Sequence, residues 1–233
     1  MSYKEILNDL KRRIFKPVYF LCGEEPYFID KISDYVEANV LNEDEREFNQ
    51  TIFYGKEVTM EQILETAKRF PMMSEFQVVI VKEAQNLKDF TSRSGKADEM
   101  DEEDDSMNEK SPVSAKGNAL LHYLENPQPS TILVFCHKYK KPDKRQKLGK
   151  LLTSKTVYFE SDKLKDWDMP KYISGLLQEM QLKVVDQVPY LLAEYLGNDI
   201  SKIVNELDKL AINIPQGTTI TLDHIQKNIG ISK

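Results

Sequence analysis

The chain has 233 residues, of which 40% are apolar and 30% charged, a composition that supports a packed core and excludes a disordered polypeptide. Two cysteines exclude a disulfide scaffold, the apolar runs are too short to cross a bilayer, and Met1–Glu5 lacks the features of a signal peptide. The net charge of −6 is uneven, because residues 91–118 hold eight acids against four bases, which leaves −2 for the rest. We therefore expect a soluble, cytoplasmic protein of one or two domains, with no membrane partner.

The first two thirds of the chain alternate short apolar runs with helical patterns. Five runs predict β-strands, at Val18–Cys22, Phe48–Phe53, Gln77–Lys82, Ile132–His137 and Thr156–Glu160. Helical spacing predicts helices at Tyr3–Arg13, Tyr27–Leu41, Thr59–Arg69, Gly117–Glu125 and Lys144–Leu152. Alternation of this kind favours a parallel sheet with right-handed crossovers, and three of the strands are apolar enough to be covered on both faces. The sequence therefore predicts an α/β domain.

The strand pattern stops after Glu160. Helices are expected at roughly 168–180, 187–196, 199–212 and 221–229, with cap signals such as Asp168 before Pro170 and Thr221. This predicts a small helical domain that begins near Ser161–Trp167, so we divide the chain into residues 1–162 and 163–233.

An acidic stretch at about 91–116 differs from its surroundings. Seven of the eight residues 98–105 are acidic, and the stretch has no apolar period. Such a segment buries too little apolar surface to offset its ordering entropy. We expect a solvated loop inserted in the first domain; the alternative is an acidic recognition segment.

The end of the first predicted strand is where a phosphate-binding loop would lie. Such a loop needs a second Gly, a Lys and a Ser or Thr, and the positions counted from Gly23 hold Phe28, Ile29 and Asp30. Glu24 and Glu25 add negative charge where an anionic ligand would bind. The pattern indicates a nucleotide site that has been plugged.

Other catalytic patterns are weak. The third strand ends in Lys82-Glu83, where a nucleotide hydrolase would place a metal-holding Asp. The three histidines are scattered, and Cys22 and Cys136 are interpreted as buried reduced thiols, with no metal site supported. We therefore expect no catalytic residues, no metal and no cofactor.

Three ordered motifs carry a family resemblance. Val18–Ile29 combines an apolar strand with Gly-Glu-Glu-Pro-aromatic before a helix; Leu120–Pro127 is followed by Ser130–Phe135, and Leu191–Asp199 by Asn205–Leu210. On these motifs the chain resembles the delta subunit of the bacterial DNA polymerase III clamp loader. The resemblance covers nearly the whole chain outside the acidic stretch.

The resemblance implies an AAA+-like parallel five-stranded sheet with flanking helices over residues 1–162, followed by a small all-α lid domain over 163–233. It implies a non-catalytic component of the DNA polymerase III holoenzyme that binds the sliding clamp and helps open it for loading onto primed DNA during replication. The implied partners are the clamp (beta subunit), the delta prime and gamma/tau subunits, and primed DNA through the complex. Family members carry a further C-terminal collar domain, which this chain is expected to lack.

In this family the clamp-binding element before the third strand is commonly Pro-Leu-Phe-Gly-Glu-Arg-Arg, and here it is Pro71-Met-Met-Ser-Glu-Phe-Gln77. The resemblance implies clamp contacts by Phe70, Pro71, Met72 and Met73. Met replaces the aromatic residue, and Phe and Gln replace the two bases. The alternative is that these apolar side chains fold back onto the sheet edge.

A basic patch places seven bases within residues 138–150, opposed locally only by Asp143. The candidate contacts to DNA phosphates are Lys138, Lys140, Lys141, Lys144 and Arg145. An ordinary solvated face is the competing interpretation. Two alternative functions stay open: an AAA+-type ATPase with an atypical phosphate loop at Gly23, and a DNA-binding module centred on this patch.

Overall fold

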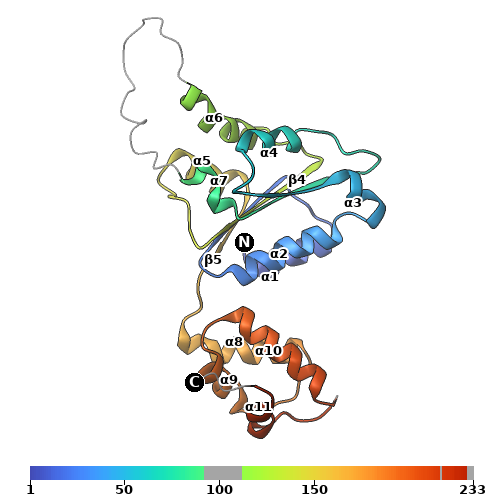
Figure 1. Ribbon diagram of the computed structural model, residues 1–233, viewed down its shortest axis with the longest axis vertical. Coiled ribbons are helices and arrows are strands. Elements are labelled where there is room, and N and C mark those ends of the chain that lie inside the picture. Colours follow the sequence, from blue (N-terminus) through green and yellow to red (C-terminus); the bar gives the residue numbers. More distant parts are fainter. Residues whose placement is uncertain (92–111, 216, 230–233) are drawn as a thin grey trace, which may run out of the picture. The chain divides into compact units, whose positions relative to one another are not determined.

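Five parallel strands form a sheet in the computed structural model, which describes residues 1–91, 112–215 and 217–229 (Figure 1). They are β1 (Val18–Gly23), β2 (Gln50–Tyr54), β3 (Gln77–Lys82), β4 (Thr131–Lys138) and β5 (Val157–Ser161). Their order is β2-β3-β4-β1-β5, and every neighbouring pair is parallel. The carboxyl ends of all five strands therefore lie at one edge of the sheet.

Helices cover both faces of this sheet. On one face pack α1 (Tyr3–Lys11) and α2 (Pro26–Asn39), and on the other α4 (Met60–Ala67), α6 (Pro112–Glu125) and α7 (Lys147–Lys155) (Figure 1). Successive residues of β1 alternate between the two cores, with Phe20 on the α4 face and Leu21 on the α2 face, both fully buried. This two-sided burial is why β1, β3 and β4 are continuous apolar runs.

The structure adds short helices that the sequence pattern did not predict: α3 (Glu43–Asn49), η1 (Ala84–Asn86), α5 (Lys88–Thr91) and η2 (Asp166–Asp168). The predicted strand Phe48–Phe53 was wrong at its start, because Phe48 and Asn49 end α3. The signal for α3 is a capping box, in which the Asn42 side chain accepts from the Glu45 backbone and the Glu45 side chain accepts from the Asn42 backbone.

The predicted loop at 91–116 is also corrected at its end. Helix α6 begins at Pro112, so residues 112–116 are helical, and the predicted helix Gly117–Glu125 starts five residues earlier. Residues 92–111, which hold the acidic run, lie outside the described residues.

The chain divides into two compact units, Met1–Asp162 and Lys163–Lys233. The second unit contains α8 (Met169–Glu179), α9 (Val188–Leu196), α10 (Ile200–Asn213) and α11 (Leu222–Asn228), close to the predicted helices. Each helix contributes a fully buried apolar side chain to its core: Ile173, Leu192, Leu207 and Ile225. The predicted AAA+-like α/β fold followed by helices is thus confirmed. Within the described ranges, none of the helices has both the length and the apolar character needed to span a membrane.

Candidate functional site

The loop that follows β1 is closed by the end of β5. The Ser161 carbonyl accepts hydrogen bonds from the backbone N–H of Glu24 at 2.8 Å and of Glu25 at 3.3 Å. The Ser161 hydroxyl in turn donates to the Glu25 carbonyl at 2.8 Å. Backbone N–H groups at this position are what a phosphate-binding loop offers its ligand. Here they are already satisfied by the protein itself.

Glu25 occupies the N-terminus of α2. Its side chain is only 5% exposed and accepts from the backbone N–H of Tyr27 at 3.0 Å, which makes it the N-cap of the helix. A carboxylate here interacts favourably with the positive end of the helix dipole. Glu25 therefore takes the role that a phosphate has at the corresponding helix of a nucleotide-binding protein.

The three residues expected to plug the loop lie elsewhere, which corrects that part of the sequence interpretation. Ile29 is fully buried in the core between the sheet and α2, and the Phe28 ring packs on Tyr3 of α1 with ring centroids 4.9 Å apart. The Asp30 carboxylate pairs with the Lys138 ammonium at 2.6 Å. All three lie inside α2, as the predicted helix Tyr27–Leu41 has them, and their side chains are taken up by these contacts. Closure comes from Ser161 and Glu25.

Lys82, at the end of β3, forms an ion pair with a carboxylate of α2. Its ammonium lies 2.8 Å from the Glu37 carboxylate. Burial lowers the pKa of Lys82, but the hydrogen bond and charge of Glu37 outweigh this effect and raise it. A permanent cation therefore stands where a nucleotide hydrolase would hold a metal with a carboxylate.

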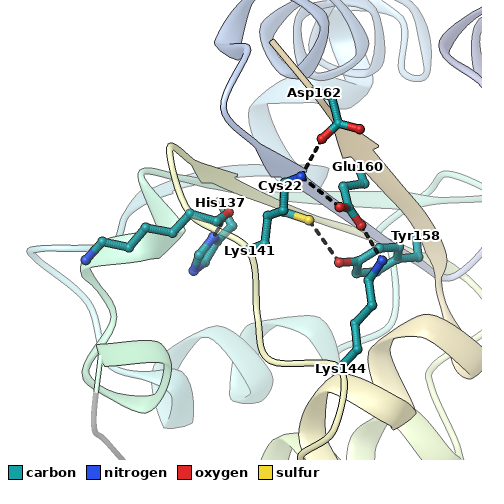
Figure 2. Close-up of polar contacts among 8 residues, drawn as sticks. Cys22, His137, Lys141, Lys144, Tyr158, Glu160 and Asp162 are labelled. Carbon is teal, nitrogen blue, oxygen red and sulfur yellow. Dashed lines mark hydrogen bonds and ion pairs between the residues drawn. The ribbon is translucent and has the colours of Figure 1, made fainter.

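The predicted DNA-contact bases are largely paired with carboxylates. Figure 2 shows Lys141 reaching both Glu160 and Asp162, while Lys144 reaches Glu160 at 2.5 Å. Lys138 pairs with Asp30, and the Arg145 guanidinium lies 3.2 Å from Asp143. Of the five candidates, only Lys140 has no carboxylate partner within the part of the chain that the structure describes. The patch is thus much closer to neutral than its sequence indicates.

Both cysteines are buried free thiols, as predicted. The Cys22 thiol donates to the Tyr158 hydroxyl at 3.2 Å (Figure 2), and burial raises the pKa of each cysteine to about 11. His137 is buried against Phe20 and Phe90, and burial lowers its pKa. Within the described ranges there is also no cluster of His, Cys, Asp and Glu suited to hold a metal ion.

The segment Phe70–Met73, here named the methionine loop, exposes the apolar residues Phe70, Met72 and Met73. Pro71 between them is half-buried. Phe70 is 79% exposed, Met72 63% and Met73 103%, so none of the three folds back onto the sheet edge. Met73 also has a left-handed backbone conformation with φ of 54°. A non-glycine residue in that region is uncommon and is kept only where its surroundings define it.

The methionine loop starts from a firmly held helix end. The Gln77 side-chain amide donates to the Arg69 carbonyl at 2.8 Å, and the Thr131 hydroxyl donates to the Ala67 carbonyl at 2.8 Å. Both side chains are buried. Carbonyls at the end of α4 have no partner within the helix, so these bonds from β3 and β4 satisfy them. Past the loop, the Phe76 ring packs edge-on against Phe15 at 5.3 Å.

Two residues beside this loop were missed by the sequence analysis. Asn49, at the end of α3, bonds to the Met72 backbone, and Phe48 before it is 65% exposed. Both had been assigned to a strand. Recognition of the capping box at Asn42 would have placed them on a helix.

The fold and the closed loop after β1 define an AAA+-like protein. In the position of a phosphate-binding loop, its backbone N–H groups donate to Ser161 and Glu25 of the chain itself. The family model for the DNA polymerase III delta subunit matches residues 19–162, and the chain belongs to this family. The family resemblance drawn from the sequence motifs is therefore confirmed.

A curated sequence and a solved structure, both from Bacillus subtilis, are similar to this chain. DNA polymerase III subunit delta of strain 168 is 26% identical over 222 residues, which cover 95% of this chain and 59% of the relative. The solved structure of the B. subtilis DNA clamp loader delta protein (YqeN) matches with a TM-score of 0.72 and 24% identity, and covers 99% of this chain and 63% of that one. This chain thus spans about three fifths of their length, and the structural match shows the same fold.

Proposed function

We propose that this chain is the clamp-binding part of a clamp-loader subunit, and that the methionine loop docks into an apolar pocket on the sliding clamp. The observation that carries the proposal is the exposure of Phe70, Met72 and Met73 on a loop whose two ends are anchored. Large apolar side chains that project together into solvent are typical of protein–protein contact sites. Family membership and the clamp-loader description of the B. subtilis relative point to the clamp as the partner.

Methionine suits this task. Its long, polarizable side chain adapts to the shape of an apolar groove. Burial of Met72 and Met73 on a partner would contribute on the order of 3–5 kcal/mol before the entropy of association is subtracted. If the pocket is better formed in the open ring, this binding energy shifts the clamp toward the open state without any chemical step.

The proposed subunit acts without hydrolysing a nucleotide itself. The loop amides bond to Ser161, Glu25 caps α2, and Lys82 replaces the metal-holding carboxylate. ATP-driven rearrangement would then come from the delta prime and gamma/tau partners. The ATPase alternative predicts a higher melting temperature with saturating ATP and magnesium, since a ligand at 100 times its Kd adds about 2.7 kcal/mol of stability. We expect no shift.

The DNA-binding alternative has weaker support than the base count indicated. Four of its five candidate residues, Lys138, Lys141, Lys144 and Arg145, already face carboxylates. We place contact with primed DNA at the level of the whole complex. Strong binding of primed DNA by this chain alone at low salt would favour the DNA-binding module instead.

Calorimetric titration of the cognate clamp tests the proposal. We expect Met72→Ala/Met73→Ala to weaken clamp binding by about 100-fold, from the loss of on the order of 3 kcal/mol of apolar burial. Ile212→Ala is the matched control, since Ile212 is 83% exposed in the second unit and should leave the affinity unchanged. Equal affinities for the double variant and the unchanged chain would refute the proposal.

A further inference from the structure

Asn49 bonds to both polar groups of the Met72 backbone. Its side-chain Oδ1 accepts from the Met72 N–H at 2.6 Å, and its Nδ2 donates to the Met72 carbonyl at 2.9 Å. The Asn49 side chain is only 4% exposed, while the Met72 side chain is 63% exposed. One buried amide thus holds the backbone of the loop and leaves the apolar side chain outside.

The helix that carries Asn49 is itself attached to its neighbours. The Arg46 guanidinium donates to the Leu41 carbonyl at 3.2 Å and to the Ala38 carbonyl, which joins α3 to the end of α2. Asn49 Nδ2 also lies 3.0 Å from the Glu45 carbonyl within α3. The loop is therefore held to a helix that is in turn held to the body of the domain.

A fixed backbone at Met72 changes the energetics of docking. Ordering the backbone of a residue carries an entropy cost, which a flexible loop incurs when it binds. Because Asn49 holds Met72, and Met73 next to it keeps a left-handed conformation, that ordering is completed on folding. The two methionines are then presented in one arrangement.

We propose that Asn49 is a positioning residue, which pre-organises Met72 and Met73 for the clamp pocket and thereby sets the affinity of clamp binding. This inference rests on the proposed function, because it assumes that the methionine loop is the docking element. It assigns a binding role to a residue whose side chain bonds to the backbone of the methionine loop at Met72.

A purely structural role for Asn49 makes a different prediction. If Asn49 served only overall stability, its loss would affect clamp binding equally whether or not the two methionines are present. If it positions them, its effect must disappear when they are absent. A double-mutant cycle between Asn49 and the methionine pair separates these cases.

The first measurement needs no clamp. Hydrogen exchange of the Met72 amide should become at least about tenfold faster in Asn49→Ala, because the amide loses its acceptor. Asn86→Ala is the matched control: Asn86 is half-buried, donates to Glu83 at 3.0 Å, and lies past the opposite end of β3. Unchanged exchange at Met72 in Asn49→Ala would show that the loop is not held by this residue.

The second measurement is clamp affinity through the cycle. We expect Asn49→Ala to weaken binding by about tenfold, which corresponds to about 1.4 kcal/mol, and by less than about twofold in the Met72→Ala/Met73→Ala background. Asn49→Asp keeps the acceptor for the Met72 N–H but loses the donor, so its affinity should be intermediate. This variant also serves if Asn49→Ala does not fold.

The outcomes distinguish the two proposals. If Met72→Ala/Met73→Ala leaves clamp affinity unchanged, the proposed function is refuted whatever Asn49 does. If that double variant weakens binding while Asn49→Ala and Asn49→Asp do not, the positioning role alone is refuted. An equal loss from Asn49→Ala in both backgrounds would also refute it.

Discussion

Replacement of Gly23 by Ala tests whether the loop after β1 is closed by Ser161 at the end of β5. Gly23 has φ of 128°, a conformation that residues with a side chain rarely adopt. An added Cβ would lie 2.1 Å from the Ser161 carbonyl oxygen, far inside van der Waals contact. That oxygen is the acceptor for Glu24 and Glu25, so β5 cannot retreat without breaking the closure.

The expected loss of stability has two parts. A strained backbone conformation costs of the order of 1–3 kcal/mol. Movement of Ser161 away from the new Cβ also weakens the hydrogen bonds from Glu24 and Glu25, at about 0.5–1.5 kcal/mol each. We therefore expect Gly23→Ala to reduce the free energy of unfolding by about 2–6 kcal/mol, a large fraction of the roughly 5–15 kcal/mol typical of a domain.

Urea unfolding followed by circular dichroism measures this loss. Gly175→Ala is the control, because Gly175 lies inside α8 and the added Cβ would meet no atom within 4 Å apart from its chain neighbours and the backbone of its own helix, and Ala is favoured over Gly in a helix by roughly 0.5–1 kcal/mol. A Gly23→Ala variant as stable as the unchanged chain would refute the close approach of Ser161. A variant of normal stability that gained or lost ATP binding would show that Gly23 serves a ligand instead.

Two further predictions concern titrating groups. Burial raises the pKa of Cys22 and Cys136 from 9.0 to about 11, so the neutral thiols stabilise the fold fully below about pH 9 and this contribution falls as the pH rises toward 11. Neither thiol should react with iodoacetamide in the native chain near neutral pH, whereas both should react in urea; rapid native labelling would contradict the burial. The pKa of Glu160 lies below its usual 4.5, chiefly because its carboxylate accepts a hydrogen bond from Lys144. Burial acts in the opposite direction, and the hydrogen bond from Lys141 lowers the pKa further. The contribution of Glu160 is therefore complete well above pH 4.5 and is lost as the pH falls through the folded pKa, so Glu160→Gln should cost about 1 kcal/mol near neutral pH and less near pH 3. Urea unfolding at both pH values checks this, and an equal deficit at both would show that ion pairing is not the cause.

Much of the fold could be predicted from the sequence, because its signals are local. The apolar runs of β1, β3 and β4 and the helical spacing between them are patterns over a few neighbouring residues, and so is the helical spacing after Ser161, where the described residues form no further strand of the sheet. The start of β2 was wrong because Phe48 continues an apolar pattern, whereas the capping box at Asn42 begins a helix that takes it in.

The site was less predictable, because its residues meet only after folding. Asp143 is the only acid near the basic patch in sequence, yet Asp30, Glu160 and Asp162 from other parts of the fold pair with three of its bases, Lys138, Lys141 and Lys144. Likewise, no pattern near Met72 indicates its bonds to Asn49, 23 residues away.

The sequence by itself thus determined the order of the strands and of most helices, the departure from a phosphate-binding motif at Gly23, and the resemblance to the family. The tertiary structure decided that Ser161 and Glu25 close the phosphate loop, and that Phe70, Met72 and Met73 face solvent. The physical reason is range: periodicity and capping act between neighbours along the chain, whereas hydrogen-bond partners, charge neutralisation and exposure depend on groups brought together by the parallel sheet and its helices.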